Sequence, residues 1–193
     1  MYGRVHKQMA AVVAALIMAG GTVMADVTST EPLLLDDFSN PSAVSAIGTS
    51  WRGFTDRVMG GRSDMSAGIV SDDESSALRM IGDVSLENNG GFIQVRLPLS
   101  TSRQGFDARD YDGIELEVRG VGDAYYLHLR TSRNRFPWAH YAAELPISDE
   151  WETVRVPFDR FASEYSLGNR APDLGRLTSV AVVAAKAEFR ADV

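Results

Sequence analysis

Short segments in which apolar and polar residues alternate recur along this chain, and they constrain its fold more than any other feature. The clearest runs from Gly113 to Arg119, where Ile114, Leu116 and Val118 alternate with charged residues. Successive side chains of a β-strand point to opposite faces, so this period of two predicts a strand with one buried face. Clusters of Gly, Asn, Asp and Pro separate such segments, and no convincing amphipathic helix appears. The pattern predicts an all-β fold.

Further strands are expected at spacings typical of antiparallel sheets. They cover residues 33–38, 77–84, 91–97, 125–130, 140–145, 152–156 and 178–185. The turn from Gly120 to Asp123 is expected to join the strands on either side of it into a hairpin. Residues 178–185 are nearly all apolar, which predicts burial on both faces. Because so many short strands need two packed sheets to bury their apolar faces, the predicted fold is a β-sandwich jelly roll.

The first 25 residues have the features of a secretory signal peptide. Arg4 and Lys7 precede an apolar stretch from Met9 to Met18, and Val23 and Ala25 place small residues where a signal peptidase cuts. The apolar stretch is short for a membrane span, and an uncleaved anchor is the alternative. We expect an exported protein, periplasmic or secreted, with a signal peptide over residues 1–25, an exposed leader over 26–32 and a single β-sandwich domain over 33–193. No membrane span is expected after cleavage.

The net charge of the part expected to be exported limits the classes of molecule that it can bind. Removing Arg4 and Lys7 leaves 17 basic against 26 acidic side chains, a net charge of −9. An acidic surface disfavours nucleic acid and anionic membranes as partners. The chain has no cysteine, so neither disulfides nor thiol chemistry contribute, and core burial alone must stabilise the fold.

No catalytic constellation emerges from the residues. Only His128 and His140 remain as imidazoles after cleavage, so neither a zinc site nor a cofactor is expected, while calcium at surface carboxylates stays open. The sequence contains neither a Gly-x-Ser-x-Gly elbow nor a Ser-x-x-Lys pair, so it offers neither of these motifs for nucleophilic catalysis. A glycosidase needs only two carboxylates across a cleft, so a carbohydrate-active enzyme stays an alternative to a non-enzymatic domain.

One face of the predicted sheet is rich in hydrogen-bonding groups, because strand parity places several polar residues on the same side. The candidate binding residues are Gln94, Arg96, Tyr126, His128 and Arg130, with His140 and Glu144 on a third strand and Trp138 and Tyr141 near the edge. Arginine, amide and aromatic groups suit a sugar or a peptide, whereas an ordinary solvated face is the alternative. The segment from Arg133 to Trp138 has the arginine and aromatic content of interface loops, although plain packing also accounts for it.

Two glycine-containing segments form a second group of candidates. The first holds Trp51, Asp56, Met59, Gly60, Gly61 and Ser63, and the second holds Asn89, Gly90, Gly91 and Phe92. Paired glycines suit positive φ or a close approach of backbone to a neighbouring segment. We expect a structural role, in which Trp51, Phe54 and Met59 plug one end of the sandwich and Asp56 bonds the backbone of its own loop. The alternative is a binding rim.

These two segments resemble the complex I intermediate-associated protein 30 family, whose domains carry Asp-x-Val-Met-Gly-Gly-x-Ser followed by Asn-Gly-Gly-Phe. The resemblance covers most of residues 33–190 and extends to the Gly120-x-Gly122-Asp123-x-Tyr125 turn and to the segment from Trp151 to Phe161. It implies a galactose-binding-like jelly roll and, in mitochondrial relatives, a chaperone-like role in complex I assembly without catalytic residues. The export signal departs from the mitochondrial pattern.

The sequence therefore predicts a non-enzymatic exported binding domain that recognises a protein or a glycan through the polar sheet face and the Arg133–Trp138 loop. A complex I assembly factor is the first alternative. A carbohydrate-active enzyme with unidentified carboxylates is the second.

Overall fold

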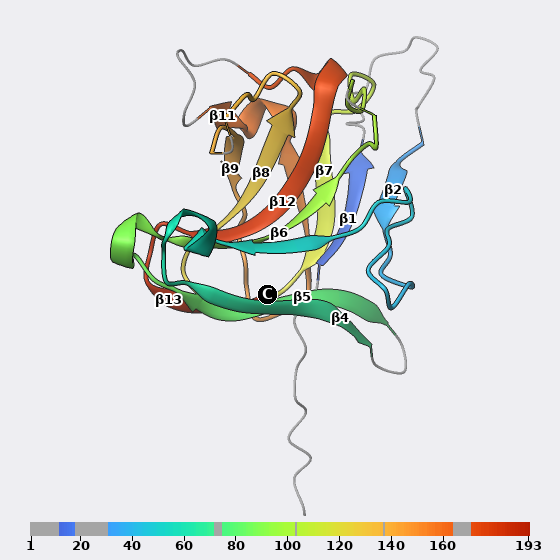
Figure 1. Cartoon of the computed structure of the whole chain (residues 1–193). Coiled ribbons are helices and arrows are strands. Elements are labelled where there is room, and N and C mark those ends of the chain that lie inside the picture. The colour runs from blue at the N-terminus through green and yellow to red at the C-terminus, as the bar shows by residue number, and fades with distance from the viewer. Residues whose placement is uncertain (1–11, 18–30, 72–74, 103, 137, 164–170) are drawn as a thin grey trace, which may run out of the picture.

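The computed structural model describes residues 12–17, 31–71, 75–102, 104–136, 138–163 and 171–193. Antiparallel strands in two facing sheets make up this part of the chain, and it contains no α-helix (Figure 1). The connections include single 3₁₀ turns at Asp56–Met59, Glu87–Asn89, Phe158–Arg160 and Leu174–Arg176. The predicted all-β jelly-roll sandwich is confirmed.

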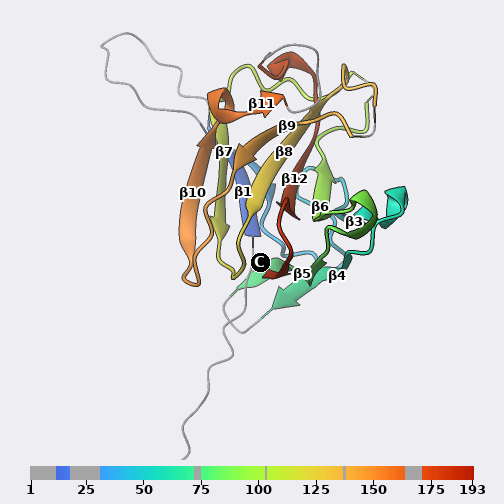
Figure 2. The same cartoon turned by 90° about the vertical axis from the view of Figure 1, so that its left-hand side faces the viewer.

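The first sheet has seven strands, in the order β10-β7-β1-β5-β13, with β2 paired to β1 and β4 paired to β5. Their bounds are β1 Val12–Ile17, β2 Leu33–Asp36, β4 Asp64–Ser71, β5 Ser76–Val84, β7 Gly113–Val118, β10 Glu152–Pro157 and β13 Phe189–Asp192. Figure 2 shows β10, β7 and β1 side by side in this layer.

The second sheet has six strands, in the order β11-β9-β8-β12-β6-β3. Their bounds are β3 Arg52–Thr55, β6 Phe92–Pro98, β8 Tyr125–Thr131, β9 Tyr141–Glu144, β11 Ala162–Ser163 and β12 Leu177–Ala185. The central strand β12 is the longest of the six, and it pairs with β8 on one side and β6 on the other.

The core fills the space between the sheets. Alternate residues of each strand point into it, as with Leu127 and Leu129 of β8 and Ile114 and Leu116 of β7, each at most 2% exposed. Burying an aliphatic side chain of this size contributes about 2 kcal/mol, before the entropy cost of ordering it. Because the chain has no cysteine, this burial stabilises the fold without any help from disulfides.

The expected strands agree with the observed ones to within about two residues, the usual uncertainty of strand ends. As predicted, β12 is buried on both faces, since its residues from Ser179 to Ala185 are all buried. The predicted hairpin across Gly120 to Asp123 is wrong: β7 pairs with β10 and β1, whereas β8 pairs with β12 and β9 in the other sheet. The turn crosses between the layers. The pattern also missed β3 and β4, whose alternation is weak.

Candidate functional site

The outer face of the six-stranded sheet carries most of the polar candidates. One row of the sheet aligns Arg52, Arg96, Ala181, His128 and Ala142, and the next aligns Phe54, Gln94, Val183, Tyr126 and Glu144. Arg130 lies on the same side as His128, two residues further along β8. We call the surface formed by Gln94, Arg96, Tyr126, His128 and Arg130 the polar face. The parity argument from the sequence thus placed these five residues together correctly.

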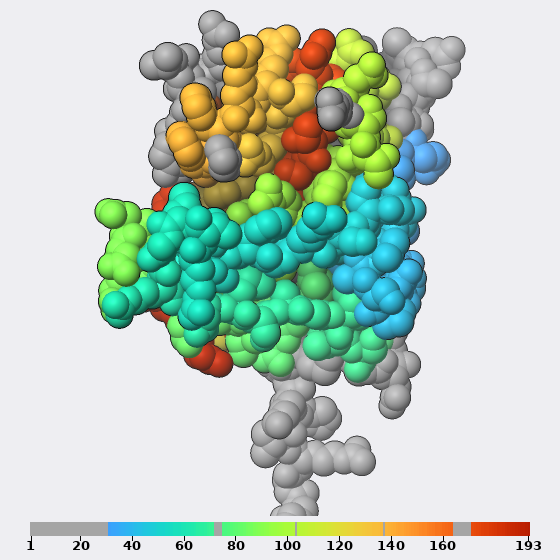
Figure 3. Space-filling view, in the orientation of Figure 1, coloured from blue at the N-terminus to red at the C-terminus, as the bar shows by residue number. Residues whose placement is uncertain are grey.

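Small apolar residues of β12 form the floor of the polar face. Ala181 and Val183 point to this outer side but are only 2% and 1% exposed, because Phe92 and Tyr126 pack against them. Figure 3 shows the molecule from the same side as Figure 1, with the red segment of β12 between the gold of β8 and β9 and the green of β6. The polar side chains therefore stand on an apolar floor, where water screens their charges poorly.

Two histidines stack on this face. The rings of His128 and His140 have centroids 3.8 Å apart and planes 14° apart. Nδ1 of His140 donates to the carbonyl oxygen of Trp138 over 2.8 Å. Burial, followed by the charges of His140, Lys186 and Arg96, lowers the pKa of His128 to about 2. His128 is therefore neutral at physiological pH and offers both a donor and an acceptor nitrogen.

Two arginines lie beside the histidines and are partly withdrawn from water. Burial lowers the pKa of Arg96 and of Arg130, and the charge of Arg130 lowers that of Arg96 further. The guanidinium carbon of Arg96 lies 4.2 Å from the ring centroid of Phe54, a cation–π contact. Nε of Arg96 and Nε2 of His128 are buried without a hydrogen-bond partner among the described residues. A ligand that supplies the missing hydrogen-bond partner to such a buried group gains binding free energy.

An exposed aromatic pair adjoins the polar face. Phe136 and Trp138 stack with ring centroids 5.1 Å apart and are 56% and 51% exposed. Their loop is tied to the face, because Arg130 donates through Nη2 to the carbonyl oxygen of Phe136 over 2.8 Å. Exposed aromatic rings held in place at low entropic cost are suited to stacking on a flat ligand.

A groove continues from the polar face toward the first sheet. It has a volume of about 1170 Å³, and its lining includes Tyr126, Glu144, Arg155 and Arg160. Lys186 also lines it, with its ammonium 4.3 Å from the ring centroid of Tyr126. The groove gives the polar face room for an extended ligand rather than a single ring.

Tyr141 does not belong to this surface. It is only 8% exposed, it pairs with Leu129, and it packs in the hydrophobic core. Residues directly opposite each other in a sheet point to the same side, and Leu129 points inward. The expectation that Tyr141 lies at the edge of the polar face is therefore wrong, whereas Trp138 is exposed there as expected.

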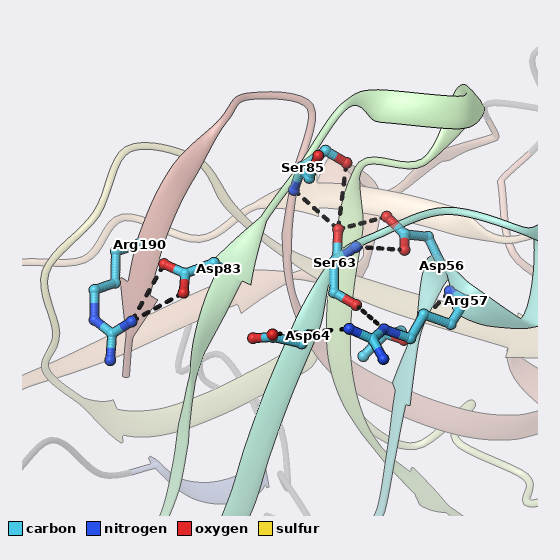
Figure 4. A network of polar contacts seen from close by, with 8 residues as sticks. Asp56, Arg57, Ser63, Asp64, Asp83, Ser85 and Arg190 are labelled. Carbon is cyan, nitrogen blue, oxygen red and sulfur yellow. Dashed lines mark hydrogen bonds and ion pairs between the residues drawn. The ribbon is translucent and has the colours of Figure 1, made fainter.

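The two glycine-containing segments meet at one buried carboxylate. Asp56 is fully buried, and its oxygens accept hydrogen bonds from the backbone nitrogen of Ser63 over 3.0 Å and from its hydroxyl over 2.5 Å. They also accept from the backbone nitrogens of Gly91 over 2.6 Å and Phe92 over 3.3 Å. Ser63 in turn accepts from the backbone nitrogen of Ser85 over 2.9 Å (Figure 4). Asp56 thus bonds its own loop, as expected, and also the second segment.

The glycines make room for this carboxylate. A Cβ atom on Gly61 would lie 2.4 Å from Cγ of Asp56, and one on Gly90 would lie 2.5 Å from Oδ2. Gly60 and Gly91 have φ values of +93° and +129°, which favour glycine. The structural interpretation of the paired glycines accounts for all four positions.

The remaining residues of these segments divide between core and surface. Trp51 belongs to the buried core, where its ring lies at a tilted angle to that of Phe38, and it donates through Nε1 to Asp36 over 2.7 Å. Met59 is 54% exposed, so the expectation that it plugs one end of the sandwich is wrong. Phe54 is half-buried under Arg96 on the outer side. Asn89 is exposed, with a φ of 57°.

The described residues contain no group of three or more His, Cys, Asp or Glu side chains placed to hold a metal ion. They also contain no helix with the length and apolar character needed to cross a membrane.

Comparison with known proteins identifies the family. The family model described as Complex I intermediate-associated protein 30 (CIA30) matches residues 37–185, which is more than half of the chain. The chain belongs to the CIA30 family. Both glycine-containing segments lie inside the matched region, as the resemblance of their motifs predicted. No curated protein gives a significant match to this CIA30 chain.

Solved structures similar to this CIA30 chain include carbohydrate-binding modules. A family 11 module from Clostridium thermocellum, in complex with a β-1,3-1,4-mixed-linked tetrasaccharide, is 15% identical with a TM-score of 0.57, over 82% of this chain and 89% of that one. The family 11 module of a cellulosomal cellulase from Clostridium thermocellum is 16% identical with a TM-score of 0.60, over 82% and 88%. At this identity the similarity establishes a shared fold.

Sequence reasoning missed two contributions to the site of this CIA30 chain. Lys186 lies beside Tyr126 because β12 ends there, and no local pattern predicts that proximity. The bond from Asp56 to the second glycine-containing segment joins residues 35 positions apart. The joint occurrence of the two motifs was the only available sign that the segments meet.

Proposed function

We propose that this protein is an exported, non-enzymatic binding domain that holds a glycan on the polar face of its six-stranded sheet. The observation that carries the proposal is the pair of buried, unpartnered nitrogens, Nε of Arg96 and Nε2 of His128, at a face that opens to solvent. Leaving such groups without partners costs about 1–3 kcal/mol each, which a ligand hydroxyl or carboxylate recovers on binding.

Sugar chemistry suits this surface. A hydroxyl group both donates and accepts, so it serves the neutral His128 whichever ring nitrogen carries the proton. Phe136 and Trp138 present exposed rings against which the apolar face of a pyranose can stack. The groove beyond Tyr126 extends the surface for a chain of several sugar units.

The structural neighbours support a glycan over a protein ligand. Both family 11 structures are carbohydrate-binding modules, and one contains a mixed-linked tetrasaccharide. The signal peptide predicted over residues 1–25 would deliver the domain to a compartment where extracellular or envelope glycans are accessible.

Binding of a glycan panel by isothermal titration calorimetry tests the proposal. The panel should contain neutral mixed-linked β-glucan oligosaccharides and oligosaccharides that carry uronic acids. We expect saturable binding to at least one class, lost in Arg96→Ala and weakened about tenfold or more in Trp138→Ala. Arg190→Ala is the matched control, because Arg190 is an exposed arginine that pairs with Asp83 on the other sheet. Equal binding by all three variants would remove the polar face from consideration.

Turnover is the outcome that separates a binding domain from a carbohydrate-active enzyme. Incubation of the same oligosaccharides with the protein should leave their length distribution unchanged. Release of shorter products that grows with protein concentration would contradict the non-enzymatic proposal.

Membership of the CIA30 family favours a second candidate, an assembly role for respiratory complex I. It predicts that deleting the gene lowers the amount of assembled complex I on native gels and that the wild-type gene restores it. Normal complex I in the deletion strain, together with glycan binding by the purified domain, would favour the first proposal.

A further inference from the structure

Two segments from opposite ends of the chain, β1 and β13, lie end to end along the same side of β5 in the first sheet. The C-terminal strand β13 pairs with residues 81–84 of β5, and Val193 exchanges hydrogen bonds of 2.7 and 3.0 Å with Met80. Strand β1 occupies the continuation of the same line, where it pairs with β7 and meets β5 at Leu78. We call this strand position, between β7 and the strands β5 and β2, the lane. Figure 1 shows β1 between β7 and β2.

The register of the flanking strands shows that the two segments are in line. Asp192 pairs with Ile81 on one side and with Val121 on the other. In an antiparallel sheet, a residue three positions after Asp192 would therefore lie opposite Leu78 and Val118. Val12 pairs with both of those residues. The pairing with β5 and the pairing with the segment of Val121 thus agree. If β13 continued as a strand past Val193, its second additional residue would lie where Val12 lies.

The lane is held in shape by contacts that do not involve β1. Tyr125 donates through its hydroxyl to the carbonyl oxygen of Val121 over 2.6 Å and accepts from the backbone nitrogen of Asp192 over 3.0 Å. On the far side of β7, β10 pairs with all six residues from Gly113 to Val118. The end of β13 and the edge of β7 are therefore fixed by other parts of the fold.

The segment in the lane has an unusual origin. Val12–Ile17 lies within the apolar stretch of the predicted signal peptide, and cleavage before Asp26 would remove it. The lane would then expose the backbone donors and acceptors of β7 and β2 over the length of β1. An unpaired strand edge next to a hydrophobic core pairs readily with another extended segment.

We propose that the lane is a strand-acceptor site, filled by Val12–Ile17 in the precursor and, after cleavage, by an extended apolar segment of another polypeptide. The site lies on the sheet opposite to the polar face, so it is a second binding function, independent of the glycan proposal. The occupant runs antiparallel to β7 and is about six residues long, like β1. It lacks proline, since each residue of a paired strand needs its backbone donor.

The test uses the full chain made by cell-free synthesis, so that no signal peptidase acts on it. In one variant, Ala14→Pro together with Ala15→Pro prevents Val12–Ile17 from pairing and leaves the lane open. Amide hydrogen exchange over Gly113–Val118 should become about tenfold faster or more in this variant. A peptide with the sequence of residues 12–17 between lysines should restore the protection, whereas the same peptide with the two prolines should not. Unchanged exchange in the proline variant would overturn the proposal.

A second variant keeps the proposal testable if the proline variant fails to fold. It adds one threonine and then the sequence of residues 12–17 after Val193 of the proline variant, which places the added strand in the register of Val12. We expect native folding and slow exchange over Gly113–Val118, with no further effect of the peptide. Adding a second threonine reverses the faces of the added strand and should abolish the rescue. Equal behaviour of the two extensions, or no rescue by the first, would overturn the proposal.

Discussion

The imidazole rings of His128 and His140 stack face to face, with centroids 3.8 Å apart. Strand β8 supplies one ring, and the residue immediately before β9 supplies the other. Two protonated rings at this distance would repel each other, and each would lose hydration, so the arrangement requires at least one neutral ring. Protonation of both rings at low pH would therefore disrupt the stack and with it the structure of the polar face.

Acid should destabilise the protein through His128. In the folded protein its pKa is lowered from the usual 6.5 to about 2, with burial as the main cause. Below about pH 6.5, His128 becomes protonated in the unfolded chain but stays neutral in the folded protein. The free energy of unfolding therefore falls by up to about 1.4 kcal/mol for each pH unit of acidification. This loss should be smaller in His128→Gln. Urea denaturation of both proteins between about pH 7 and pH 4 measures the difference, and parallel stability profiles would contradict it.

Removal of the Asp56 carboxylate should be severely destabilising. Asp56→Ala leaves the backbone donors of Ser63 and Gly91 buried without their acceptor. We expect the free energy of unfolding to drop by about 3 kcal/mol or more in chemical denaturation. Asp37→Ala is the control, since Asp37 is exposed and accepts its hydrogen bonds from the neighbouring Ser39, two residues on. Similar losses in the two variants would show that Asp56 does not join the two segments.

The glycine next to Asp56 should tolerate no side chain. Gly61→Ala places a Cβ 2.4 Å from the Asp56 carboxyl carbon, which the hydrogen bonds hold in position. We expect a loss of about 2 kcal/mol or more from overpacking. Gly68→Ala serves as the matched control, because a Cβ there meets no atom within 4 Å. The control should be neutral or slightly stabilising in the same thermal denaturation series. Equal melting temperatures for the two variants would contradict the packing described around Asp56.

If the polar face binds glycans, it should favour those with carboxylate groups. Arg96 and Arg130 hold two partly buried like charges near each other, and a carboxylate relieves that repulsion while accepting paired hydrogen bonds. We expect uronic-acid oligosaccharides to bind about tenfold more tightly than neutral ones of equal length, and the difference to shrink as salt is added. Calorimetry with Arg96→Gln, which keeps hydrogen bonding without charge, should abolish the preference. An unchanged preference in that variant would assign it to another surface.

Processing of the precursor should leave Asp26 as the first residue. Val23 and Ala25 provide the small side chains that signal peptidase accepts. Mass spectrometry of the protein from an exporting cell should detect an N-terminal peptide that begins at Asp26, and Ala25→Arg should leave the precursor intact. A full-length N-terminus in the wild-type protein would instead support an uncleaved anchor.

Strand parity explains how much of the polar face was predictable. Arg96 and His128 lie on different strands 32 positions apart, yet each alternates with core residues of its own strand, so both had to point outward. Parity also points Tyr141 inward, on the side opposite to Glu144, so the expectation that it lies at the edge of the face did not follow from parity. His140 precedes β9 and reaches the face through the loop that carries Trp138.

The sequence by itself determined the strand segments, the class of fold and the side of each strand that faces the core, because alternation is a local property of the chain. Which strands pair was decided only in the tertiary structure: β7 and β8 are consecutive, yet they belong to different sheets. The same holds for the contact of Asp56 with Gly91 and for the meeting of β13 with β1 in one lane. These relationships join residues far apart in the chain, and closure of the two sheets around a common core selects them, which no local pattern encodes.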